Sequence, residues 1–414
     1  MTLLPASNRR AWLRTAGVNT LRPVIALNGD TYASLSIKQE VPTMPVGSTE
    51  LRPHRLHVGL FDIQGSKLVR RTSVELDVAG ALTEVSAFTG QKSADLVLIN
   101  DKDQSYAKLR FDERSIATMK SHLGGLNDSL ARGLIWASLW DSCRDGELSA
   151  TDYVTIALNA LKNESDISIV SATLMQIDTA IWAYADPAKR EALRLNVANS
   201  VEKLLDASAP ASDHQMAFAR AFANFAVTPA QFDRIKAILD GSLNGLVIDA
   251  EIRWYIFICG VKRGVFGPTD IESESAKDQT AHGKQYTARA YASMPTKEAK
   301  SKAFHSVTTD DLSNTIHSYT CLGFNENIHH EVLADFVDPY FDSMLKVWET
   351  KGYEIAETTA NLLFPSWVIT SETLAKADHW LNVTGKDASS ALRRAITEGR
   401  DAMSRALKAR AADK

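Results

Sequence analysis

Residues 96–139 read LVLINDKDQSYAKLRFDERSIATMKSHLGGLNDSLARGLIWASL, and the spacing of their apolar side chains changes partway along. Leu96–Ile99 form an unbroken apolar run, which is typical of a strand buried on both faces. From about residue 113 the apolar residues follow a helical period instead. One apolar stripe at that period consists of Leu130, Leu134, Ile135 and Leu139. The sequence therefore predicts a boundary between strands and helices near Phe111.

Residues 24–111, on the N-terminal side of this boundary, alternate apolar and polar residues in short runs. The alternating apolar positions are Ala33, Leu35 and Ile37, then Leu56, Val58 and Leu60, then Val74, Leu76 and Val78. Turn-forming segments such as Asn28-Gly29-Asp30 separate the runs. About seven short strands at roughly ten-residue spacing predict a small antiparallel β-sandwich.

Residues 112–414, on the C-terminal side, are predicted to be entirely helical. Ser149 is followed three residues later by Asp152, and Thr228 precedes Pro229, so both positions are favourable helix starts. The connections are short, and helix pairs recur about every 35–45 residues. This rhythm predicts a superhelical stack of the armadillo or HEAT kind, which would offer a curved face to a peptide or another domain.

Composition excludes several classes of protein. The 414 residues are 45% hydrophobic with a net charge of -4, so there is no basic excess for a nucleic-acid partner. No apolar run approaches the ~18 residues of a membrane span; the most apolar, Trp254–Val261, is followed by Lys262 and Arg263. The three cysteines are far apart and form no Cys-x-x-Cys pair, which predicts reduced, mostly buried thiols and a cytoplasmic location.

Motifs that carry catalytic chemistry do not occur in the sequence. A zinc peptidase needs His-Glu-x-x-His, because histidines four residues apart lie on one face of a helix. His330-Glu331 begins such a motif, but Ala334 stands where the second histidine is required. There is also no serine nucleophile elbow and no Gly-rich phosphate loop. Composition and spacing predict a β-plus-α protein without a metal site, and they name no activity.

Longer segments resemble the aminopeptidase N family, in its actinobacterial form. Residues 12–23, WLRTAGVNTLRP, are similar to the end of that family's catalytic domain. Tyr106, Ala107, Lys108, Arg110 and Asp112 resemble its Tyr-Ala-Lys-x-Arg-x-Asp strand, which closes the sandwich and opens the helical domain. Further similar segments include Arg220-Ala221-Phe222, Arg253-Trp254, Gly323-Phe324 and Glu398-Gly399-Arg400-Asp401. These similarities occur in order along nearly the full length.

The resemblance implies a portion of a four-domain zinc enzyme that removes N-terminal residues from peptides. The chain matches its last two domains, and residues 1–23 would be a remnant of the end of the catalytic domain. The zinc motif and the Gly-x-Met-Glu-Asn segment that holds the substrate's amine belong to the missing domains. We therefore expect no catalytic residue, no cofactor in this chain and no enzymatic activity from it alone.

The resemblance also implies that the helical domain encloses the substrate chamber and contacts the C-terminal side of a peptide. An arginine suits a peptide carboxylate because its fork donates two hydrogen bonds at once. The candidates are Arg220, Arg253 and Arg289, with Phe324 and Asn325 on a second stretch of the chamber wall. For Arg253 the alternative is a helix arginine paired with a nearby acid. For Phe324 and Asn325 the alternative is an ordinary turn between helices.

Two functions remain open. The chain could be the non-catalytic portion of an aminopeptidase, with the catalytic half and peptide substrates as its partners. It could instead be a stand-alone helical-repeat module that binds a peptide or a protein. The retained similarity of residues 12–20 to the exit of a catalytic domain favours the first.

Overall fold

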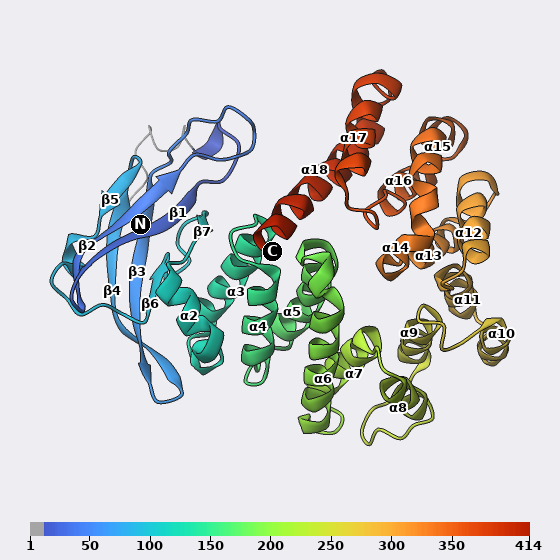
Figure 1. Ribbon diagram of the computed structural model, residues 1–414, viewed down its shortest axis with the longest axis horizontal. Coiled ribbons are helices and arrows are strands. Elements are labelled where there is room, and N and C mark those ends of the chain that lie inside the picture. The colour runs from blue at the N-terminus through green and yellow to red at the C-terminus, as the bar shows by residue number, and fades with distance from the viewer. Residues whose placement is uncertain (1–11) are drawn as a thin grey trace. The chain divides into compact units, whose positions relative to one another are not determined.

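A computed structural model describes residues 12–414 (Figure 1). The chain forms two compact units: the first extends to Ile177, and the second runs from Asp178 to Lys414. This division lies within the helical part, some way after the expected boundary near residue 111. The expected domains 1–23, 24–111 and 112–414 remain predictions, and residues 1–11 lie outside the described range.

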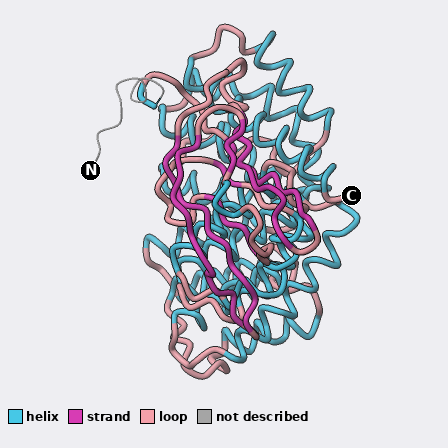
Figure 2. The backbone as a smooth tube through the Cα atoms, turned by 90° about the vertical axis from the view of Figure 1, so that its left-hand side faces the viewer, coloured by secondary structure: helices cyan, strands magenta, loops and turns pink. Residues whose placement is uncertain are grey.

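The strands of the first unit form two sheets (Figure 2, magenta). One has the order β5-β2-β1-β7 and the other the order β4-β3-β6. The strands are β1 (Thr20–Asn28), β2 (Thr31–Glu40), β3 (His54–Gln64), β4 (Lys67–Val78), β5 (Leu82–Glu84), β6 (Leu96–Ile99) and β7 (Lys108–Leu109). Strand pairing is antiparallel except between β1 and β7, where Thr20 pairs with Lys108 and Leu21 with Leu109 in parallel. The short β7 has this direction because it leads the chain out of the sheet toward the helices.

The core of the sandwich lies between the two sheets. Leu35 and Ile37 of β2 face Leu56, Val58 and Leu60 of β3, and all five are fully buried. Every residue of β6 is buried, which confirms the strand predicted from the apolar run at 96–99. Ala33, expected on the buried face, is exposed because Tyr32 takes the core position before Leu35.

The helical pattern begins where the sequence predicts. The Asp112 side chain accepts a hydrogen bond from the Ser115 backbone N–H at the start of α2. The helices up to the division between the units are α2 (Glu113–His122), α3 (Ser129–Arg144), α4 (Ala150–Leu161) and α5 (Ile167–Thr179). Leu134 of α3 packs against the sandwich core, whereas Leu130, expected on the same stripe, is 49% exposed. A helix at the edge of a sandwich buries a narrower stripe than one in the middle of a bundle.

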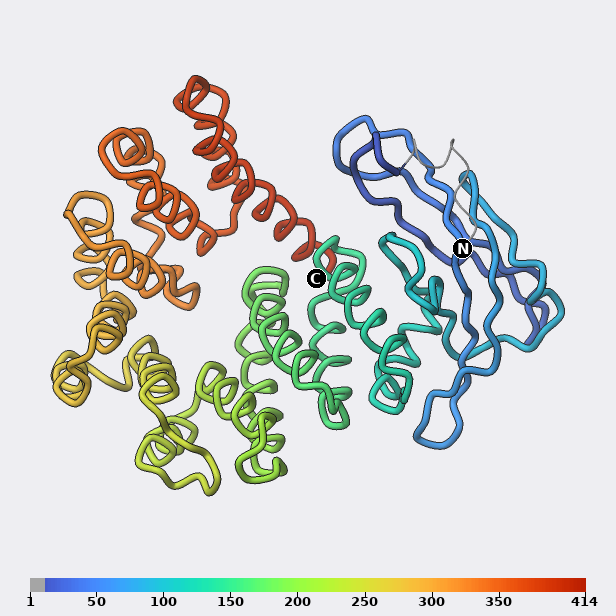
Figure 3. Tube along the Cα trace, turned by 180° about the vertical axis from the view of Figure 1, so that it is seen from behind, coloured from blue at the N-terminus to red at the C-terminus, as the bar shows by residue number. Residues whose placement is uncertain are grey.

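The second unit is a two-layer stack of helices (Figure 3). Its α-helices are α6 (Arg190–Ala207), α7 (Asp213–Phe225), α8 (Pro229–Leu239), α9 (Ala250–Val261), α10 (Pro268–Lys277), α11 (Ala281–Ser293), α12 (Lys297–Thr309), α13 (Asn314–Phe324), α14 (His330–Leu333), α15 (Val337–Thr350), α16 (Tyr353–Leu362), α17 (Ser371–His379) and α18 (Ser390–Ala412). In the first layer, α7, α9, α11, α13, α16 and α18 pack in succession. The helices α8, α10, α12, α15 and α17 each pack on the next member of that layer. This confirms the superhelical architecture.

The last helix returns to the start of the second unit. Arg410 of α18 donates hydrogen bonds to the carbonyls of Ala183 and Trp182, which lie in the π-helical turn η3 (Ala180–Tyr184). The Asp186 backbone N–H donates to the Asp413 carboxylate at 2.9 Å. These contacts join the first and last turns of the unit, so its helices form a closed series rather than an open array.

Candidate functional site

The first layer of the second unit places several helix ends along one edge. Helices of one layer run in the same direction because each pair is antiparallel, so the C-terminal ends of α7, α9, α11 and α13 lie on the same side of the stack. The last carbonyls of a helix lack partners within the helix and carry a partial negative charge. Cations are therefore stabilised at this edge.

Six basic side chains gather there, and we call Arg190, Arg194, Lys262, Arg263, Arg289 and Lys300 the cationic cluster. Burial and the neighbouring charge of Arg194 together lower the pKa of Arg263 to about 10. Burial would raise the pKa of Glu326, but the charges of Lys262, Arg289 and Lys300 hold it below its usual value. These mutual effects place Arg194, Lys262, Arg263, Arg289 and Lys300 in one electrostatic neighbourhood, and Arg190 lies one turn from Arg194 on α6.

Three members of the cationic cluster bond to the ends of helices. The Lys300 ammonium is fully buried and donates to the carbonyls of Ala292, Gly323 and Phe324 at 2.7, 2.9 and 3.1 Å. Arg194 donates to the Asn224 carbonyl near the end of α7. Lys262 donates to the Asn224 side-chain oxygen at 2.8 Å and lies 3.3 Å from a Glu326 carboxylate oxygen. These three cations therefore stabilise the ends of helices, so part of the positive charge of the cationic cluster has a structural role.

Several other donors of the cationic cluster have no acceptor within residues 12–414. The Nε and Nη2 atoms of both Arg190 and Arg263 are covered by protein and make no hydrogen bond within residues 12–414. The same is true of the Nε atoms of Arg194 and Arg289. Buried polar groups in native proteins are almost always paired, and unpaired ones mark strained or functional positions. An anion or an ordered water would satisfy these donors.

The acids near the cationic cluster are too few to balance it. Glu326 lies inside, and a carboxylate oxygen of Asp178 is 3.9 Å from Arg194. Asp186 lies beside Arg190 and raises its pKa, while burial has the larger effect and lowers that pKa to about 10. Burial also lowers the pKa of Lys300 to about 7. The arrangement is chemically an electropositive site with unfilled hydrogen-bond donors.

Two of the arginines expected to contact substrate differ in how they are bonded. The Arg253 side chain uses Nε and Nη2 on the Glu274 carboxylate and donates from Nη1 to the Leu239 carbonyl at 2.9 Å. Its donors are thus occupied within the chain, as in the alternative considered for it. Arg220 bonds to Glu251 at 2.6 Å and lies 5.1 Å from the centre of the Tyr255 ring, while its Nε has no acceptor.

The other expected site residues also lie at different depths. Arg289 is half-buried at the edge of the cationic cluster. Phe324 is fully buried, and its ring contacts those of Phe304, Phe336 and Trp367, so its side chain has no surface to offer a ligand. Asn325 follows it, half-buried, and its side-chain oxygen has no donor.

Sequence reasoning did not select most of the cationic cluster. Arg190 and Arg194 lie on α6 and Lys300 lies on α12, far away in the sequence, and nothing local distinguishes them from ordinary helix cations. Lys262 and Arg263 do carry a signal, because they follow the most apolar helix of the chain. We used them only as an argument against a membrane span, although charges at the end of a buried helix must themselves lie close to the core.

The residues present do not fit a catalytic zinc. Among residues 12–414 there is no group of three or more His, Cys, Asp or Glu side chains that could hold a metal ion. His330 lies at the start of the one-turn helix α14, where its ring packs on Trp182 at 5.4 Å. The three cysteines are free and buried, as predicted. No helix of the described chain is long and apolar enough to cross a membrane.

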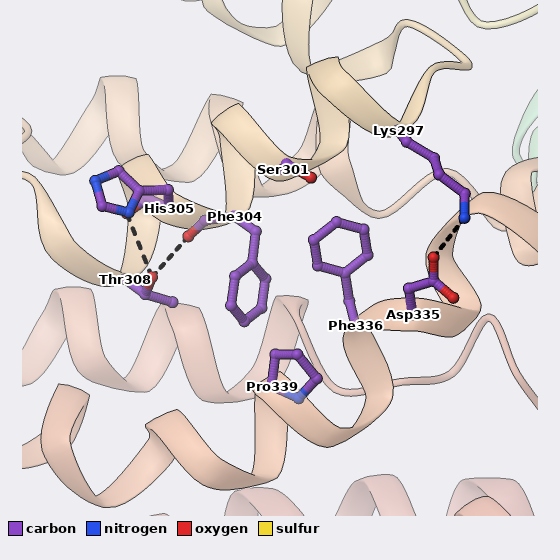
Figure 4. Close-up of a pocket in the computed structure, with 8 residues that line it drawn as sticks. All are labelled: Lys297, Ser301, Phe304, His305, Thr308, Asp335, Phe336 and Pro339. Carbon is purple, nitrogen blue, oxygen red and sulfur yellow. Dashed lines mark hydrogen bonds and ion pairs between the residues drawn. The ribbon is translucent and has the colours of Figure 1, made fainter.

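A separate cavity of about 360 Å³ lies between α12 and α15 (Figure 4). Phe304, Phe336 and Pro339 provide its apolar wall. The Lys297 ammonium and the Asp335 carboxylate pair at one end at 2.6 Å. Ser301, His305 and Thr308 add polar groups to the lining. Most of the arginine donors of the second unit that lack an acceptor within residues 12–414 lie in the cationic cluster instead.

Comparisons with known proteins agree on the kind of chain this is. Residues 96–405 match the family model described as the ERAP1-like C-terminal domain. An "Aminopeptidase N" from Streptomyces lividans is 41% identical over 412 residues, which cover 98% of this chain and 48% of that protein. A crystal structure of Legionella pneumophila aminopeptidase A in complex with aspartic acid has the same fold, with a TM-score of 0.58 at 12% identity over 96% of this chain and 50% of that one. The chain spans about half the length of these relatives.

Proposed function

This chain belongs to the family of the ERAP1-like C-terminal domain and corresponds to the C-terminal half of an aminopeptidase N, and from this premise we propose how it acts. It serves as the non-catalytic portion of a zinc aminopeptidase that removes N-terminal residues from peptides. The observation that best supports this proposal is the 41% identity to the Streptomyces lividans protein, which extends over nearly all of this chain but only 48% of that protein. The zinc and the residues that cleave the peptide bond would then be supplied by the other half.

The first unit offers a surface for such a catalytic half. Four large apolar side chains are exposed around the segment where the described chain begins, and we call them the apolar rim. They are Leu13, Met44, Val46 and Tyr106, with exposed fractions of 80, 59, 87 and 73%. Clustered exposed apolar residues are typical of interaction sites. The proposed partner is the catalytic domain, whose end residues 12–23 resemble.

The segment beside the apolar rim is held firmly to the sandwich. The buried Arg52 side chain donates to Asn19 Oδ1, Thr15 Oγ1 and the Ala16 carbonyl at 3.1, 2.7 and 2.9 Å. Gly17 has φ +93°, and a Cβ there would lie 2.3 Å from the Met44 carbonyl oxygen, so only glycine fits. A fixed segment would orient a preceding domain against the rim.

The second unit would form the wall of the substrate chamber and contact the C-terminal side of a peptide. The unfilled donors of the cationic cluster support this, since a peptide carboxylate would satisfy them. Among the expected contact residues, Arg220, Arg289 and Asn325 have unfilled polar atoms that support the role. Arg253 has its donors engaged, and Phe324 could act only by supporting its neighbours.

Association with a catalytic half tests the proposal. The N-terminal half of the Streptomyces lividans relative, which this chain does not match, is mixed with the full chain and analysed by sedimentation. We expect a one-to-one complex that Val46→Ser and Met44→Ser weaken, because each removes apolar contact area. Val383→Ser is the matched control. The Val383 side chain is likewise exposed, at 55%, but it belongs to the second unit and not to the apolar rim.

The alternative is a stand-alone helical-repeat module that binds a peptide or protein. The specific observation in its favour is that the cationic cluster lies wholly within the second unit and needs no other half to be assembled. Failure of association together with tight peptide binding by this chain alone would support the alternative. A complex disrupted by the rim variants and unaffected by Val383→Ser would exclude it.

A further inference from the structure

One face of α12 lines the cavity between α12 and α15. The opposite wall comes from the turn η6 (Ala334–Phe336) and the first turn of α15. The residues of α12 that line it recur at helical spacing: Lys297, Ser301, Phe304, His305 and Thr308. The volume of about 360 Å³ lies near the lower end of the ~300–1,000 Å³ that is typical of small-molecule sites. A ligand the size of a single amino acid suits this volume.

The middle of the cavity is apolar (Figure 4). The Phe304 and Phe336 rings lie there with their centres 5.3 Å apart, and Pro339 lies beside them. The Phe324 ring contacts both, which holds the two rings in place. Phe304 is half-buried and Pro339 is exposed, so part of this apolar surface faces solvent. An aromatic or branched apolar side chain that covered it would remove that surface from water.

One end of the cavity carries a cation and an anion side by side. The Lys297 Nζ atom lies 2.6 Å from Asp335 Oδ2, and the two side chains are 71 and 61% exposed. An ion pair as exposed as this contributes little to stability, so a ligand can displace it at small cost. A ligand that brings an anion for Lys297 and a cation for Asp335 restores both charge contacts.

The opposite end of the cavity is polar but already engaged. The Thr308 hydroxyl donates to the Phe304 carbonyl of its own helix at 2.7 Å. Of the described residues that line the cavity, only His305 could add a further charge, and its Nε2 atom lies 3.8 Å from an Asp310 carboxylate oxygen. The charged part of a ligand therefore belongs at the end formed by Lys297 and Asp335.

A free α-amino acid combines these features in one small molecule. Its ammonium and its carboxylate are attached to the same carbon, so they lie as close together as the charges of Lys297 and Asp335. Its side chain leaves from that carbon toward the apolar rings. In a dipeptide the two charges are separated by a further residue, about 3.3 Å of extended chain, and no longer match a single pair. An amine or a carboxylate alone would leave one member of the pair without a partner.

We propose that this cavity binds a free amino acid with an aromatic or branched apolar side chain. The ligand carboxylate pairs with Lys297, and the ligand ammonium pairs with Asp335. The side chain of the ligand covers the rings of Phe304 and Phe336. Free amino acids are what an aminopeptidase releases, so the site would take a product of the whole enzyme. That role rests on the proposed function, whereas the binding itself does not.

NMR titration of L-phenylalanine with the full 414-residue chain, observed on the ligand, tests the proposal. A ligand of about a dozen heavy atoms should bind with a Kd on the order of 1 mM. L-Alanine is the comparator that lacks the ring. N-acetylphenylalanine, phenylalaninamide and the dipeptide Phe-Ala remove or separate the charges. We expect each comparator to bind about tenfold more weakly or worse, because each loses the apolar contact or one charge contact.

Matched variants separate this site from general attraction of charge. Lys297→Gln and Asp335→Asn each remove one charge and should weaken phenylalanine binding about tenfold. Lys376→Gln is the control, because Lys376 is also exposed and also pairs with an aspartate, Asp338 of α15, but does not line the cavity. It should bind phenylalanine as the unaltered chain does. Melting curves confirm that each variant is folded.

Several results would overturn the proposal. One is equal binding of phenylalanine and any of its four comparators, and another is binding that neither Lys297→Gln nor Asp335→Asn weakens. An equal loss with Lys376→Gln would assign the effect to overall charge. Binding that does not saturate up to about 20 mM phenylalanine would also contradict the proposal. The proposed function fails separately, because its test measures association with a catalytic half and uses no free amino acid.

Discussion

Two arginines, Arg110 in the first compact unit and Arg263 in the second, are bonded in opposite ways. In the first unit, the Arg110 side chain is 3% exposed and bonds to Asp141, Asp145 and Glu147 at 3.1, 2.6 and 2.9 Å. Lys108 adds a second cation, 2.6 Å from Asp145. Every charge there has an opposite partner within the chain.

In the second unit, the cationic cluster has six basic residues and fewer acids. In two of its arginines, Arg190 and Arg263, the edge formed by Nε and Nη2 has no acceptor within residues 12–414. The comparison shows that burial of an arginine does not by itself indicate a role. Arg110 makes structural contacts with its filled donors, whereas Arg263 leaves its Nε and Nη2 donors without an acceptor within residues 12–414. Removing Arg110 and removing Arg263 should therefore have opposite consequences.

The largest effect is expected from Arg110→Met. Removal of the cation would leave three neighbouring carboxylates without their shared partner, and breaking a buried ion-pair network in this way costs about 3–5 kcal/mol. We expect a corresponding loss in the free energy of unfolding of the first unit, measured by urea denaturation. Arg55→Met is the control, because Arg55 also pairs with two acids but its side chain is 61% exposed, and it should unfold as the unaltered chain does.

The Arg110 network should also depend on pH in a defined direction. Burial would raise the pKa of Glu147, but Arg110 and Arg22 lower it overall, and Lys108 with Arg110 does the same for Asp145. The stabilisation is therefore complete above the unfolded pKa values of about 4 and is lost as the pH falls through the lowered ones. Unfolding curves between pH 6 and pH 3 should converge for the unaltered chain and Arg110→Met. Parallel curves would contradict the assignment.

A smaller effect is expected from Lys300→Met, within the cationic cluster. Its three carbonyl acceptors would lose their donor, at a cost of about 2–4 kcal/mol. Burial lowers the pKa of Lys300 to about 7, below the ~10.4 of a lysine in an unfolded chain. Since the unfolded state then holds the proton more tightly, the Lys300 contribution to stability rises between about pH 7 and pH 10.

Urea denaturation at pH 7 and pH 9 measures this contribution. The unaltered chain should gain stability relative to Lys300→Met as the pH rises. Lys297→Met, at a side chain that is 71% exposed three residues earlier on the same helix, should show neither the loss nor the pH dependence. A stability difference that is constant with pH would mean that Lys300 does not titrate in the folded chain in this range.

The smallest effect, and the sharpest contrast with Arg110, is expected from Arg263→Gln. This change removes a cation that makes no ion pair within residues 12–414 and lies beside Arg194, although Asp178 and Glu191 act on it from a distance. The change should leave stability unchanged or raise it by up to about 1 kcal/mol. The midpoint of urea denaturation reports the result. A loss as large as that of Arg110→Met would show that Arg263 is a structural cation and would remove the distinction between filled and empty edges.

Local sequence signals were sufficient for much of the fold. The change of apolar period near residue 111 coincides with the start of α2, where Asp112 caps the helix. Ser149 and Thr228 cap α4 and α8 as predicted, the latter with a full capping box. Such signals succeed because a cap and the first turn that it bonds lie within four residues of each other.

The candidate site could not be predicted in the same way. Arg253 looked available in the sequence, but its partner Glu274 lies 21 residues away on another helix. The cationic cluster draws on α6, α11, α12 and the two residues after α9, which come together only when the helices stack. The parallel pairing of β7 likewise depends on where the chain leaves the sheet. Only the resemblance to a known family indicated that peptide contacts should be sought in the helical part.

Hydrolysis of leucine p-nitroanilide tests the central claim most directly. This chain, the N-terminal half of the Streptomyces lividans relative and their mixture are assayed with and without a chelator. The account predicts no turnover by this chain alone, and turnover by the mixture that exceeds that of the N-terminal half and stops when the chelator is added. Chelator-sensitive turnover by this chain alone would contradict the claim that it is the non-catalytic portion of an aminopeptidase.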